Sequence, residues 1–374
     1  MSIAYFAHEL ADPAVQKRVR MLRAGGGEIE LLGFERRRFA GDAQAPAPHI
    51  LGRTANGKLF ARVFSVLAAL PRAWRLRDVW GKADALLARN LEMLAIVTLL
   101  AAFTGSRRRI VYECLDIHRL MLSRGPVGVL MRAIERACLA HIALVITSSP
   151  AFDARYFRAV QNYRGETLVV ENKVLALSGA ARAQAVPAAG PPWTIAWCGV
   201  LRCRQSLRLL RRLADEHGEL VRIELWGAPA LDQIPDFHEV VAGSPRMRFN
   251  GAYKPEDLPA IYGAAHFVWA IDYYEAGGNS DWLLPNRLYE GLYFGAPPIA
   301  VTGVETARWL TRHGVGVVVD PPLHETLTGF LESCTPQRYG EIRAAAQNVD
   351  LQSVAVTLDF CRALLARLTR DEAA

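Results

Sequence analysis

Short apolar segments alternate with amphipathic helical segments along most of the chain. Ile3–Ala7 has the pattern of a buried strand, and Pro13–Leu22 that of a helix with Asp12 as its N-cap and Pro13 at its first position. The same order recurs further along. The other strands expected in the first half are Ile29–Leu32, Asp84–Ala88, Ile110–Glu113 and Ala143–Thr147. This repeated order predicts a mostly parallel, doubly wound α/β sheet.

The alternation stops at Ala176–Pro192, a stretch rich in Ala, Gly and Pro that predicts an interdomain linker. It then resumes. The later strands expected are Thr194–Trp197, Arg222–Trp226, Met247–Phe249, Phe267–Ala270 and Val317–Val319, with helices at Ser206–His217 and Leu351–Leu368. We therefore predict two facing Rossmann-like domains with a cleft between them, over residues 1–176 and 193–350. A final helical segment, 351–374, is expected to pack back on the first domain.

The composition and charge of the chain limit the classes of partner and the kinds of site that it is expected to have. The 374 residues carry a net charge of +7, and residues 1–110 hold 18 Lys and Arg against 9 Asp and Glu. A basic first part predicts an anionic partner, such as a phospholipid surface, a diphosphate-linked lipid or a nucleic acid, unless the charge serves solubility alone. The 6 cysteines form no C-x-x-C or Cys/His cluster, so the sequence indicates neither a zinc site nor a disulfide framework. A reducing cytosol fits this pattern.

Three stretches of the sequence were assessed for a possible contact with a membrane. Leu94–Phe103 is far shorter than the ~20 residues that a spanning helix needs, and Met1–His8 has the pattern of a strand rather than a secretory leader. Lys58–Trp80 combines arginines with aromatic residues. Such a basic amphipathic helix suits a membrane interface, although core packing with a solvated basic face would give the same pattern.

Several motifs of enzyme families are absent. No G-x-G-x-x-G follows any expected strand; the first strand is followed by His8-Glu9-Leu10-Ala11-Asp12, which argues against an NAD enzyme. The P-loop signature G-x-x-x-x-G-K-[ST], G-x-S-x-G and H-E-x-x-H do not occur either. The chemistry must therefore lie in other segments.

The segment Leu283–Ala300 is the most informative one. It places Glu290 on a short helix that Gly295 ends, and an apolar strand beginning near Ile299 follows. Open α/β sheets bind ligands at the carboxyl ends of their strands, where a carboxylate can accept both hydroxyls of a ribose. An ordinary surface glutamate on an amphipathic helix is the alternative.

A second candidate segment is Trp197–Arg204, between a strand and a helix. Gly199 would let a ligand approach the backbone, while Arg202 and Arg204 can clamp a pair of phosphates beside the free N–H groups of the helix. A basic helix start exposed to solvent is the alternative.

The ordered set of such features resembles a known family. In the first half it comprises Asp12-Pro13, Lys17-Arg18-Val19, Gly33-Phe34, Tyr112-Glu113, Asp116, Glu135 and Thr147-Ser148-Ser149. In the second half it comprises Gly199, Leu225-Trp226-Gly227, Gly251, Gly277-Gly278-Asn279, Pro285-Asn286-Arg287 and Glu290. Together they resemble GT-B glycosyltransferases of the family 4 type, nearest the bacterial exopolysaccharide enzymes of the succinoglycan ExoL type.

The resemblance implies a nucleotide-sugar donor, UDP-linked, bound by the second domain. Glu290 would hold the ribose hydroxyls, Arg202 or Arg204 would meet the diphosphate, and Asn286 and Arg287 would lie near the phosphates or the donor sugar. Two positions depart from the family pattern. Trp282 stands where many members carry a second glutamate, and Val200 stands where an arginine usually follows the glycine.

Catalytic residues are expected after the strand Ile110–Glu113. Asp116 or His118 could take the proton of the acceptor hydroxyl, or orient a sugar; Asp116 could instead cap the following helix. The residues His8, Glu9 and Asp12 could touch the acceptor, and Glu275 could reach the donor sugar.

We therefore expect a hexosyltransferase that extends a lipid-linked saccharide in exopolysaccharide or other cell-surface polysaccharide synthesis. The resemblance implies no cofactor and no metal, and no Asp-x-Asp occurs. The enzyme should be cytoplasmic and peripheral on the inner face of the plasma membrane, with no nucleic-acid partner. The alternatives are a non-catalytic membrane-associated assembly protein with the same fold, and a nucleotide-sugar epimerase or hydrolase.

Overall fold

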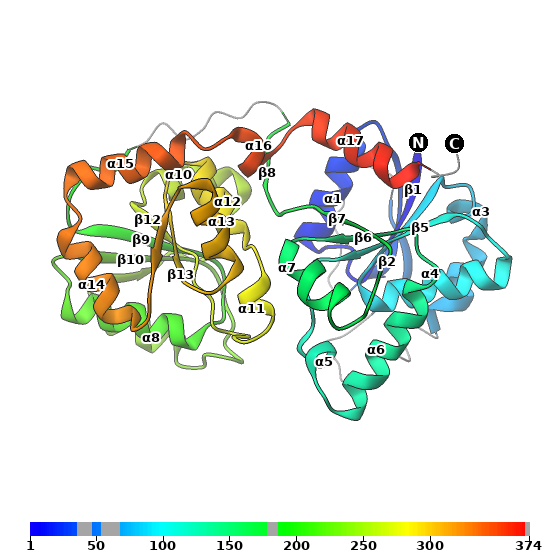
Figure 1. The fold of residues 1–374 in the computed structure, drawn as a ribbon, viewed down its shortest axis with the longest axis horizontal. Helices are drawn as coiled ribbons and strands as arrows, with labels where there is room; N and C mark the ends of the chain where they lie inside the picture. The colour runs from blue at the N-terminus through cyan, green and yellow to red at the C-terminus, as the bar shows by residue number, and fades with distance from the viewer. Residues whose placement is uncertain (36–46, 54–67, 178–185, 371–374) are drawn as a thin grey trace. The chain divides into compact units, whose positions relative to one another are not determined.

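The chain folds into two α/β units in the computed structural model (Figure 1), which describes residues 1–35, 47–53, 68–177 and 186–370. Unit 1 comprises Met1–Glu171 and Val356–Ala374, and unit 2 comprises Asn172–Ala355. Part of the expected linker Ala176–Pro192 and part of the basic stretch Lys58–Trp80 lie outside the described residues. Within the described part of the chain, no helix is long and apolar enough to cross a membrane.

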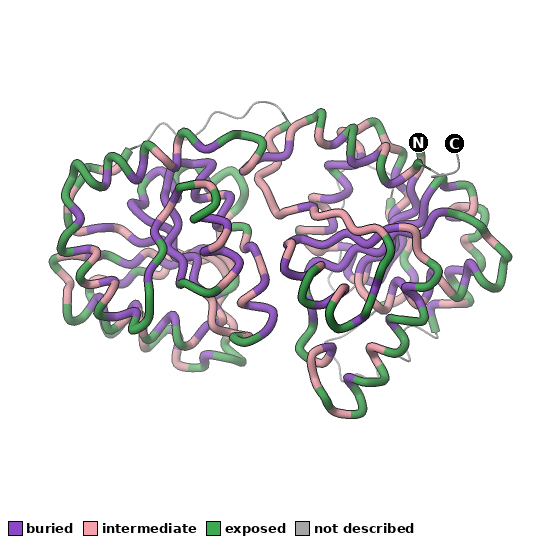
Figure 2. The backbone as a smooth tube through the Cα atoms, viewed as in Figure 1, coloured by how far each residue is buried: buried purple, intermediate pink, exposed green. Residues whose placement is uncertain are grey.

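Unit 1 is built on a parallel sheet with the strand order β3-β2-β1-β4-β5-β6-β7. Its central strands β1, β4, β5 and β6 are buried over most of their length (Figure 2), as expected for a sheet with helices on both faces, whereas the edge strands β3 and β7 are mostly intermediate or exposed. The strands are β1 Ser2–Ala7, β2 Glu28–Glu35, β3 His49–Arg53, β4 Ala85–Arg89, β5 Arg109–Cys114, β6 Leu144–Thr147 and β7 Glu166–Val169.

The first helix of unit 1 begins at the residues that its sequence predicts. The side chain of Asp12 accepts a hydrogen bond from the backbone N–H of Ala14 at 2.8 Å, and Pro13 opens α1, as predicted. The C-terminal helix α17 packs on α1. The helices are α1 Pro13–Ala24, α3 Arg77–Trp80 (after helical residues 68–75), α4 Asn90–Thr104, α5 Arg119–Leu122, α6 Pro126–Leu139, α7 Pro150–Phe152 with a π-helical turn Asp153–Arg158, and α17 Leu358–Thr369.

Unit 2 repeats the plan with the strand order β11-β10-β9-β12-β13-β14, again parallel. Fully buried tryptophans, Trp193, Trp197 and Trp269, fill its core. The strands are β9 Trp193–Leu201, β10 Val221–Pro229, β11 Met247–Phe249, β12 Phe267–Trp269, β13 Pro298–Val301 and β14 Val317–Val319. The helices are α8 Arg204–Glu216, α9 Phe237–Ala242, a 3-10 turn Pro255–Asp257, α10 Leu258–Gly263, α11 Asn279–Trp282, α12 Asn286–Tyr293, α13 Glu305–His313, α14 Leu323–Ser333, α15 Pro336–Gln347 and α16 Leu351–Val354.

The prediction of one helix over Leu351–Leu368 was wrong. The chain leaves helix α16 at Ala355–Val356, which form a short strand, β15, paired with β8 (Val174–Leu175). Extended backbone suits the Val-Ala-Val-Thr sequence, since β-branched residues are poor helix formers, and the side chain of Thr357 then caps α17. The chain therefore passes between the units at residue 355 rather than 350.

Each sheet has one position where the direction of strand addition reverses. In unit 1 the chain adds β2 and β3 on one side of β1 and then returns to place β4 on the other side. In unit 2 it adds β10 and β11 beside β9 and then places β12 on the opposite side. Because the helices that follow these strands diverge there, the carboxyl ends of β1/β4 and of β9/β12 are the expected ligand-binding positions.

Candidate functional site

The loops after β9 and β12 are joined at the switch point of unit 2. The hydroxyl of Ser206, in the first turn of α8, donates to the carbonyl of Ile271 at 3.3 Å. The guanidinium of Arg202 lies 3.8 Å from the carboxylate of Asp272 and above the ring of Tyr274, with 4.6 Å to the ring centroid. The expected basic segment after β9 is therefore held against the loop that follows β12.

Glu290 is placed on α12 with a specific hydrogen-bond partner. The hydroxyl of Tyr262, at the end of α10, donates to the Glu290 carboxylate at 2.8 Å. Tyr262 is fully buried, whereas Glu290 is partly exposed. The bond from Tyr262 orients the carboxylate, and carboxylate oxygens accept hydrogen bonds from hydroxyl groups such as those of a ribose. Ribose binding by Glu290 stays a prediction.

The surroundings of Glu290 shift the pKa values of several neighbours. Burial raises the pKa of the Cys198 thiol to about 12, and the negative charge of Glu290 adds to the rise. Burial and the charge of Glu290 likewise raise the pKa of Tyr253 above its usual range, while Arg287 acts in the opposite direction on both groups. Tyr253, Cys198 and Tyr262 therefore stay protonated at neutral pH, and Glu290 is the negative group of the site.

Arg287, one residue into α12, is the positive group beside that carboxylate. Its guanidinium approaches the carbonyl of Ile271 at only 3.5 Å, and its buried Nε has no hydrogen-bond partner among the described residues. A guanidinium with unused donors in the neighbourhood of Glu290 can bind an anion.

Glycines keep the edge of the sheet open above this pair. Gly199, at φ +116° near the end of β9, has open space where a Cβ would stand. Its partner in the ladder, Gly227 of β10, is at φ +125°, and a Cβ there would lie 1.9 Å from the Gly199 carbonyl oxygen. Gly227 therefore permits close approach of the two strands. The open space at Gly199 is compatible with the predicted approach of a ligand to the backbone, which stays a prediction.

The other residues predicted for this site differ in their surroundings. Arg204 is paired with Asp236 at 2.9 Å and donates to the carbonyl of Gln233 at 2.9 Å, so its guanidinium is already held by the protein. Asn286 is exposed at the first position of α12. Glu275 belongs to a tightly folded loop in which its backbone N–H donates to Ser280 Oγ at 2.9 Å.

Tyr262, Tyr253 and Cys198 were not predicted as site residues. Cys198 and Tyr262 stand in apolar segments whose sequence is equally typical of core, and Tyr253 stands in a polar turn segment, so no local pattern marked these three residues.

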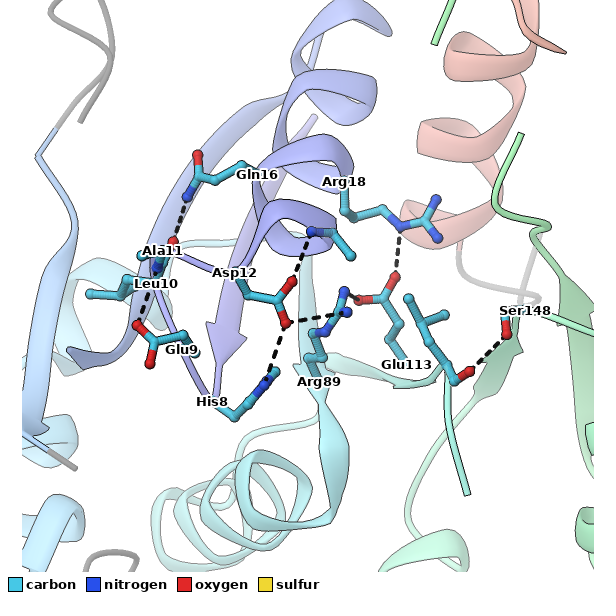
Figure 3. Close-up of polar contacts among 12 residues, drawn as sticks. His8, Glu9, Leu10, Ala11, Asp12, Gln16, Arg18, Arg89, Glu113 and Ser148 are labelled. Atoms are coloured by element: carbon cyan, nitrogen blue, oxygen red, sulfur yellow. Dashed lines mark hydrogen bonds and ion pairs between the residues drawn. The ribbon is translucent and has the colours of Figure 1, made fainter. Parts of the chain in front are cut away.

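The switch point of unit 1 holds a buried network of charges (Figure 3). Glu113 of β5 is fully buried and accepts hydrogen bonds from Arg18 at 2.6 Å and Arg89 at 3.2 Å. It also accepts a hydrogen bond from the hydroxyl of Tyr5 at 2.5 Å. Burial alone would raise the pKa of Glu113, but the two guanidinium groups and the tyrosine hold it below the usual carboxyl value. The carboxylate is therefore ionised and neutralised within the protein.

The network continues to the surface through Asp12. Its carboxylate lies 3.7 Å from Arg89 and 3.5 Å from the imidazole of His8 (Figure 3). His8 and Asp12 each keep a quarter of their side-chain surface exposed. The backbone N–H of Ala11 approaches the carboxylate of Glu9 at 3.4 Å. The structure thus brings His8 and Asp12 together, two of the residues expected near the acceptor.

Asp116 and His118 lie in the turn after β5, and both are exposed. The prediction that Asp116 could cap the following helix was wrong, because His118 is the N-cap of α5 and its Nδ1 accepts from the N–H of Leu120 at 3.3 Å. A neutral imidazole that accepts at Nδ1 carries its proton on Nε2. In that tautomer the Nε2–H of His118 can donate a hydrogen bond while Nδ1 holds the helix end, and Asp116 has no capping role at α5.

The surroundings of Glu135, one of the residues of the family resemblance, indicate a structural role. It is almost fully buried on α6 and accepts hydrogen bonds from the hydroxyls of Tyr112 at 2.8 Å and Tyr156 at 2.5 Å, and from the amide of Gln161. Burial raises its pKa. Neutral partners enclose this carboxyl, so it ties α6 to the sheet rather than facing a ligand.

One group of side chains among the described residues has the spacing of a metal site, namely Glu216, His217 and His324. It stands at the C-terminal end of α8, roughly 20 Å along the helix from Arg204 at a rise of 1.5 Å per residue. Arg212 pairs with the Glu216 carboxylate at 2.8 Å. This group is therefore separate from the Glu290 site.

Comparison with known proteins agrees with the order of motifs. No family model matches the chain. The chain is 43% identical over 379 residues to the succinoglycan biosynthesis protein ExoL of Rhizobium meliloti (strain 1021), covering 98% of this chain and 93% of that protein.

Among solved structures, sucrose-phosphate synthase from Thermosynechococcus elongatus superposes with a TM-score of 0.69 at 17% identity over 95% of this chain and 96% of that one. The glycosyltransferase WaaG, involved in lipopolysaccharide biosynthesis, gives 0.67 at 14% identity, covering 99% of this chain and 100% of that one. HepE from Anabaena in complex with UDP-glucose gives 0.65 at 17% identity over 98% of both chains. These likenesses confirm the predicted GT-B fold, and the chain belongs to the family of the succinoglycan biosynthesis protein ExoL.

Proposed function

We propose that the protein is a glycosyltransferase that moves a sugar from a UDP-linked donor to a lipid-linked saccharide during polysaccharide synthesis. The observation that carries this proposal is the arrangement of Glu290, Tyr262 and Arg287 beside the open backbone at Gly199. The relationship to ExoL supports a role in polysaccharide synthesis, and HepE, which has the same fold, was solved with UDP-glucose.

Each group of the unit 2 site has a part in donor binding. The Glu290 carboxylate, oriented by Tyr262, accepts the ribose hydroxyls. Arg287 meets the diphosphate, and Arg202 adds positive charge at the N-terminal end of α8, where free N–H groups also favour an anion. Gly199 lets the phosphates approach the backbone. Since Arg204 is held by Asp236, it acts at longer range.

In the transfer step, an acceptor hydroxyl oxygen bonds to the anomeric carbon of the donor sugar. The bond from that carbon to the β-phosphate oxygen breaks, and the electron pair leaves with UDP. Arg287 and the α8 N-terminus stabilise the charge that develops on the diphosphate, so we propose that no metal ion is needed. The proton of the hydroxyl passes to a base in unit 1.

Asp116 is the proposed base, because it is exposed after β5 and does not cap α5. His118, which caps α5 through Nδ1, is placed to donate a hydrogen bond from Nε2. The pair of His8 and Asp12 is a second candidate, since a carboxylate beside an imidazole stabilises its protonated form.

A lipid-linked acceptor places the enzyme at the inner face of the cytoplasmic membrane. The described part of the basic stretch supports this proposal, because Arg72, Arg75 and Arg77 are exposed and Trp74 is 39% exposed. Arginines beside an exposed tryptophan suit the lipid headgroup region.

The test measures UDP release from a panel of UDP-sugars, with and without a membrane lipid extract, for wild type and Glu290→Gln. We expect release from one donor, dependent on the extract, unaffected by EDTA, and reduced at least a hundredfold by Glu290→Gln. Exposed Glu341→Gln, on α15, serves as the matched control and should leave the rate unchanged.

Other outcomes separate the alternatives. Release that needs no acceptor would indicate a hydrolase, and a converted UDP-sugar without release would indicate an epimerase. An absence of UDP binding by calorimetry would contradict the proposal and favour a non-catalytic assembly protein.

A further inference from the structure

Helix α6 exposes apolar side chains along one side. Val127, Val129, Leu130 and Ile134 are 41%, 53%, 61% and 42% exposed, and three of them follow the helical spacing 127, 130, 134. A surface helix of a globular domain normally turns such a stripe toward the core. Figure 2 shows how much of α6 is exposed.

The end of helix α4 continues this apolar surface. α4 and α6 are packed together (Figure 1), and Phe103 and Leu99 of α4 are 69% and 39% exposed. A cavity of about 720 Å³ opens between the two helices, with Leu99 and Ile134 in its lining. We call the exposed surface formed by Leu99, Phe103, Val127, Leu130 and Ile134 the α4–α6 face.

The charges around the α4–α6 face are of one sign. Arg107 and Arg108, which follow α4, are exposed and line the same cavity, and Arg124 is exposed just before α6. Residues 93–112 and 117–134 contain arginines but no Asp or Glu. An apolar surface with a basic rim complements the interface of a bilayer that carries anionic lipid.

We propose that the α4–α6 face docks on an anionic lipid bilayer. Leu99, Phe103 and Leu130 would enter the boundary between headgroups and acyl chains, and Arg107, Arg108 and Arg124 would contact lipid phosphates. This inference rests on the proposed function, because a lipid-linked acceptor is the reason for the enzyme to bind a membrane. The α4–α6 face is distinct from the donor site, and membrane binding can be measured without any sugar.

A second copy of the chain is a poorer occupant of this face. A symmetric dimer would bring the same surface of both copies together, and Arg107, Arg108 and Arg124 would face one another with no acidic residue from the two segments to compensate. Nucleic acid would satisfy the arginines but not the apolar residues.

The test is flotation of the whole chain with vesicles of phosphatidylcholine alone or mixed with phosphatidylglycerol. The variants are Phe103→Ser/Leu130→Ser and Arg107→Gln/Arg108→Gln. The matched controls replace exposed unit 2 residues, Leu231→Ser/Leu351→Ser and Arg222→Gln/Arg248→Gln. Melting temperature and UDP affinity of every variant verify that the fold and the donor site are intact.

We expect wild type and both controls to bind the mixed vesicles more tightly than phosphatidylcholine alone. Each basic residue near an anionic surface contributes about fivefold to partitioning, so the double arginine variant should bind more than tenfold more weakly. The apolar variant should lose binding to a similar degree.

Variants that float like wild type would overturn the proposal, as would a wild type that binds no mixed vesicle. Loss of binding confined to Trp74→Ser would assign docking to residues 68–80 instead. A dimeric wild type that Phe103→Ser/Leu130→Ser turns monomeric would identify the face as a subunit interface. None of these results depends on sugar transfer, so failure here leaves the UDP-release test unaffected.

Discussion

The two switch points of this protein have the same kind of strand topology, but the carboxylate near each one differs in its burial and in its hydrogen-bond partners. In unit 1, Glu113 is fully buried and enclosed by Arg18 and Arg89, which neutralise it within the protein. In unit 2, Glu290 is partly exposed, and the neutral hydroxyl of Tyr262 donates a hydrogen bond to its carboxylate.

The difference shows that the carboxyl ends of the strands can have different roles in two sheets of the same topology. Ion pairs surround Glu113 at the edge in unit 1, and His8 and Asp12 at the outer end of this network keep a quarter of their side-chain surface exposed. Glycines keep the edge in unit 2 open, and the donors of Arg287 are only partly used. Substitutions at the first edge should therefore change stability, and those at the second should change binding.

The largest effect is expected for Glu113→Gln. Removing the carboxylate takes the counter-charge from buried Arg18 and leaves buried Arg89 with Asp12 alone, which costs about 3–5 kcal/mol in the free energy of unfolding. Urea unfolding at neutral pH measures this loss. Glu341→Gln breaks an exposed pair with Arg338 and should cost about 0–1 kcal/mol.

The pH dependence of that loss checks its electrostatic origin. The pKa of Glu113 is lowered in the folded protein, so its stabilising contribution is fully present above the ordinary carboxyl pKa of about 4.3 and declines as the pH falls below it. The difference between wild type and Glu113→Gln should be constant from neutral pH down to that region. A difference that already shrinks near pH 7 would contradict the assignment.

A smaller loss is expected for Gly227→Ala. The new Cβ would lie 1.9 Å from the carbonyl oxygen of Gly199 at a positive φ, so β9 and β10 must separate, at a cost of roughly 2–4 kcal/mol in stability. Gly251→Ala is the control, because its φ is also positive but its Cβ would enter open space. It should cost only about 1 kcal/mol. Equal losses in thermal unfolding would show that strand contact is not the reason for Gly227.

Arg287→Met should weaken UDP binding about 10–100-fold and leave unfolding nearly unchanged, because it removes a charge-assisted donor from the open edge. Arg204→Met removes an arginine that Asp236 already holds, and its effect on UDP affinity should be less than threefold. Isothermal titration calorimetry with UDP measures both. A larger effect of Arg204→Met would place the diphosphate nearer α8 than we propose.

The sequence predicted those parts of the fold whose signals are local. The strand Ile3–Ala7, the cap at Asp12 and the glycine after β9 depend on neighbours in the chain, and the structure has each of them. The break at Ala355–Val356 was missed because two residues are too few to alter a helical pattern, and their pairing with β8 is a long-range contact.

The candidate site was predictable only in part, for the same reason. Glu290 stood out because it is the one acidic residue of the short helix α12, just before a glycine and an apolar strand. Its partner Tyr262 is 28 residues away, and Arg18 is 95 residues from Glu113, so no spacing rule connects them. Which charges are neutralised inside the protein and which remain for a ligand is decided by the fold.

Of the two buried carboxyls, the smaller effect on stability is expected for Glu135→Gln, and it sharpens the contrast with Glu113. Burial raises the pKa of Glu135 in the folded state, so the folded chain binds this proton more tightly than the unfolded chain does. The group is therefore least costly at acidic pH, and wild-type stability falls as the pH rises through the raised pKa. A glutamine keeps the size of the side chain, can bond Tyr112 and Tyr156, and is neutral at every pH. The stability of the variant should lie within about 1 kcal/mol of wild type at neutral pH, and the variant should become more stable relative to wild type as the pH increases. A loss as large as that of Glu113→Gln would mean that Glu135 is a charged partner in the fold, and the two buried carboxyls would then serve the same purpose.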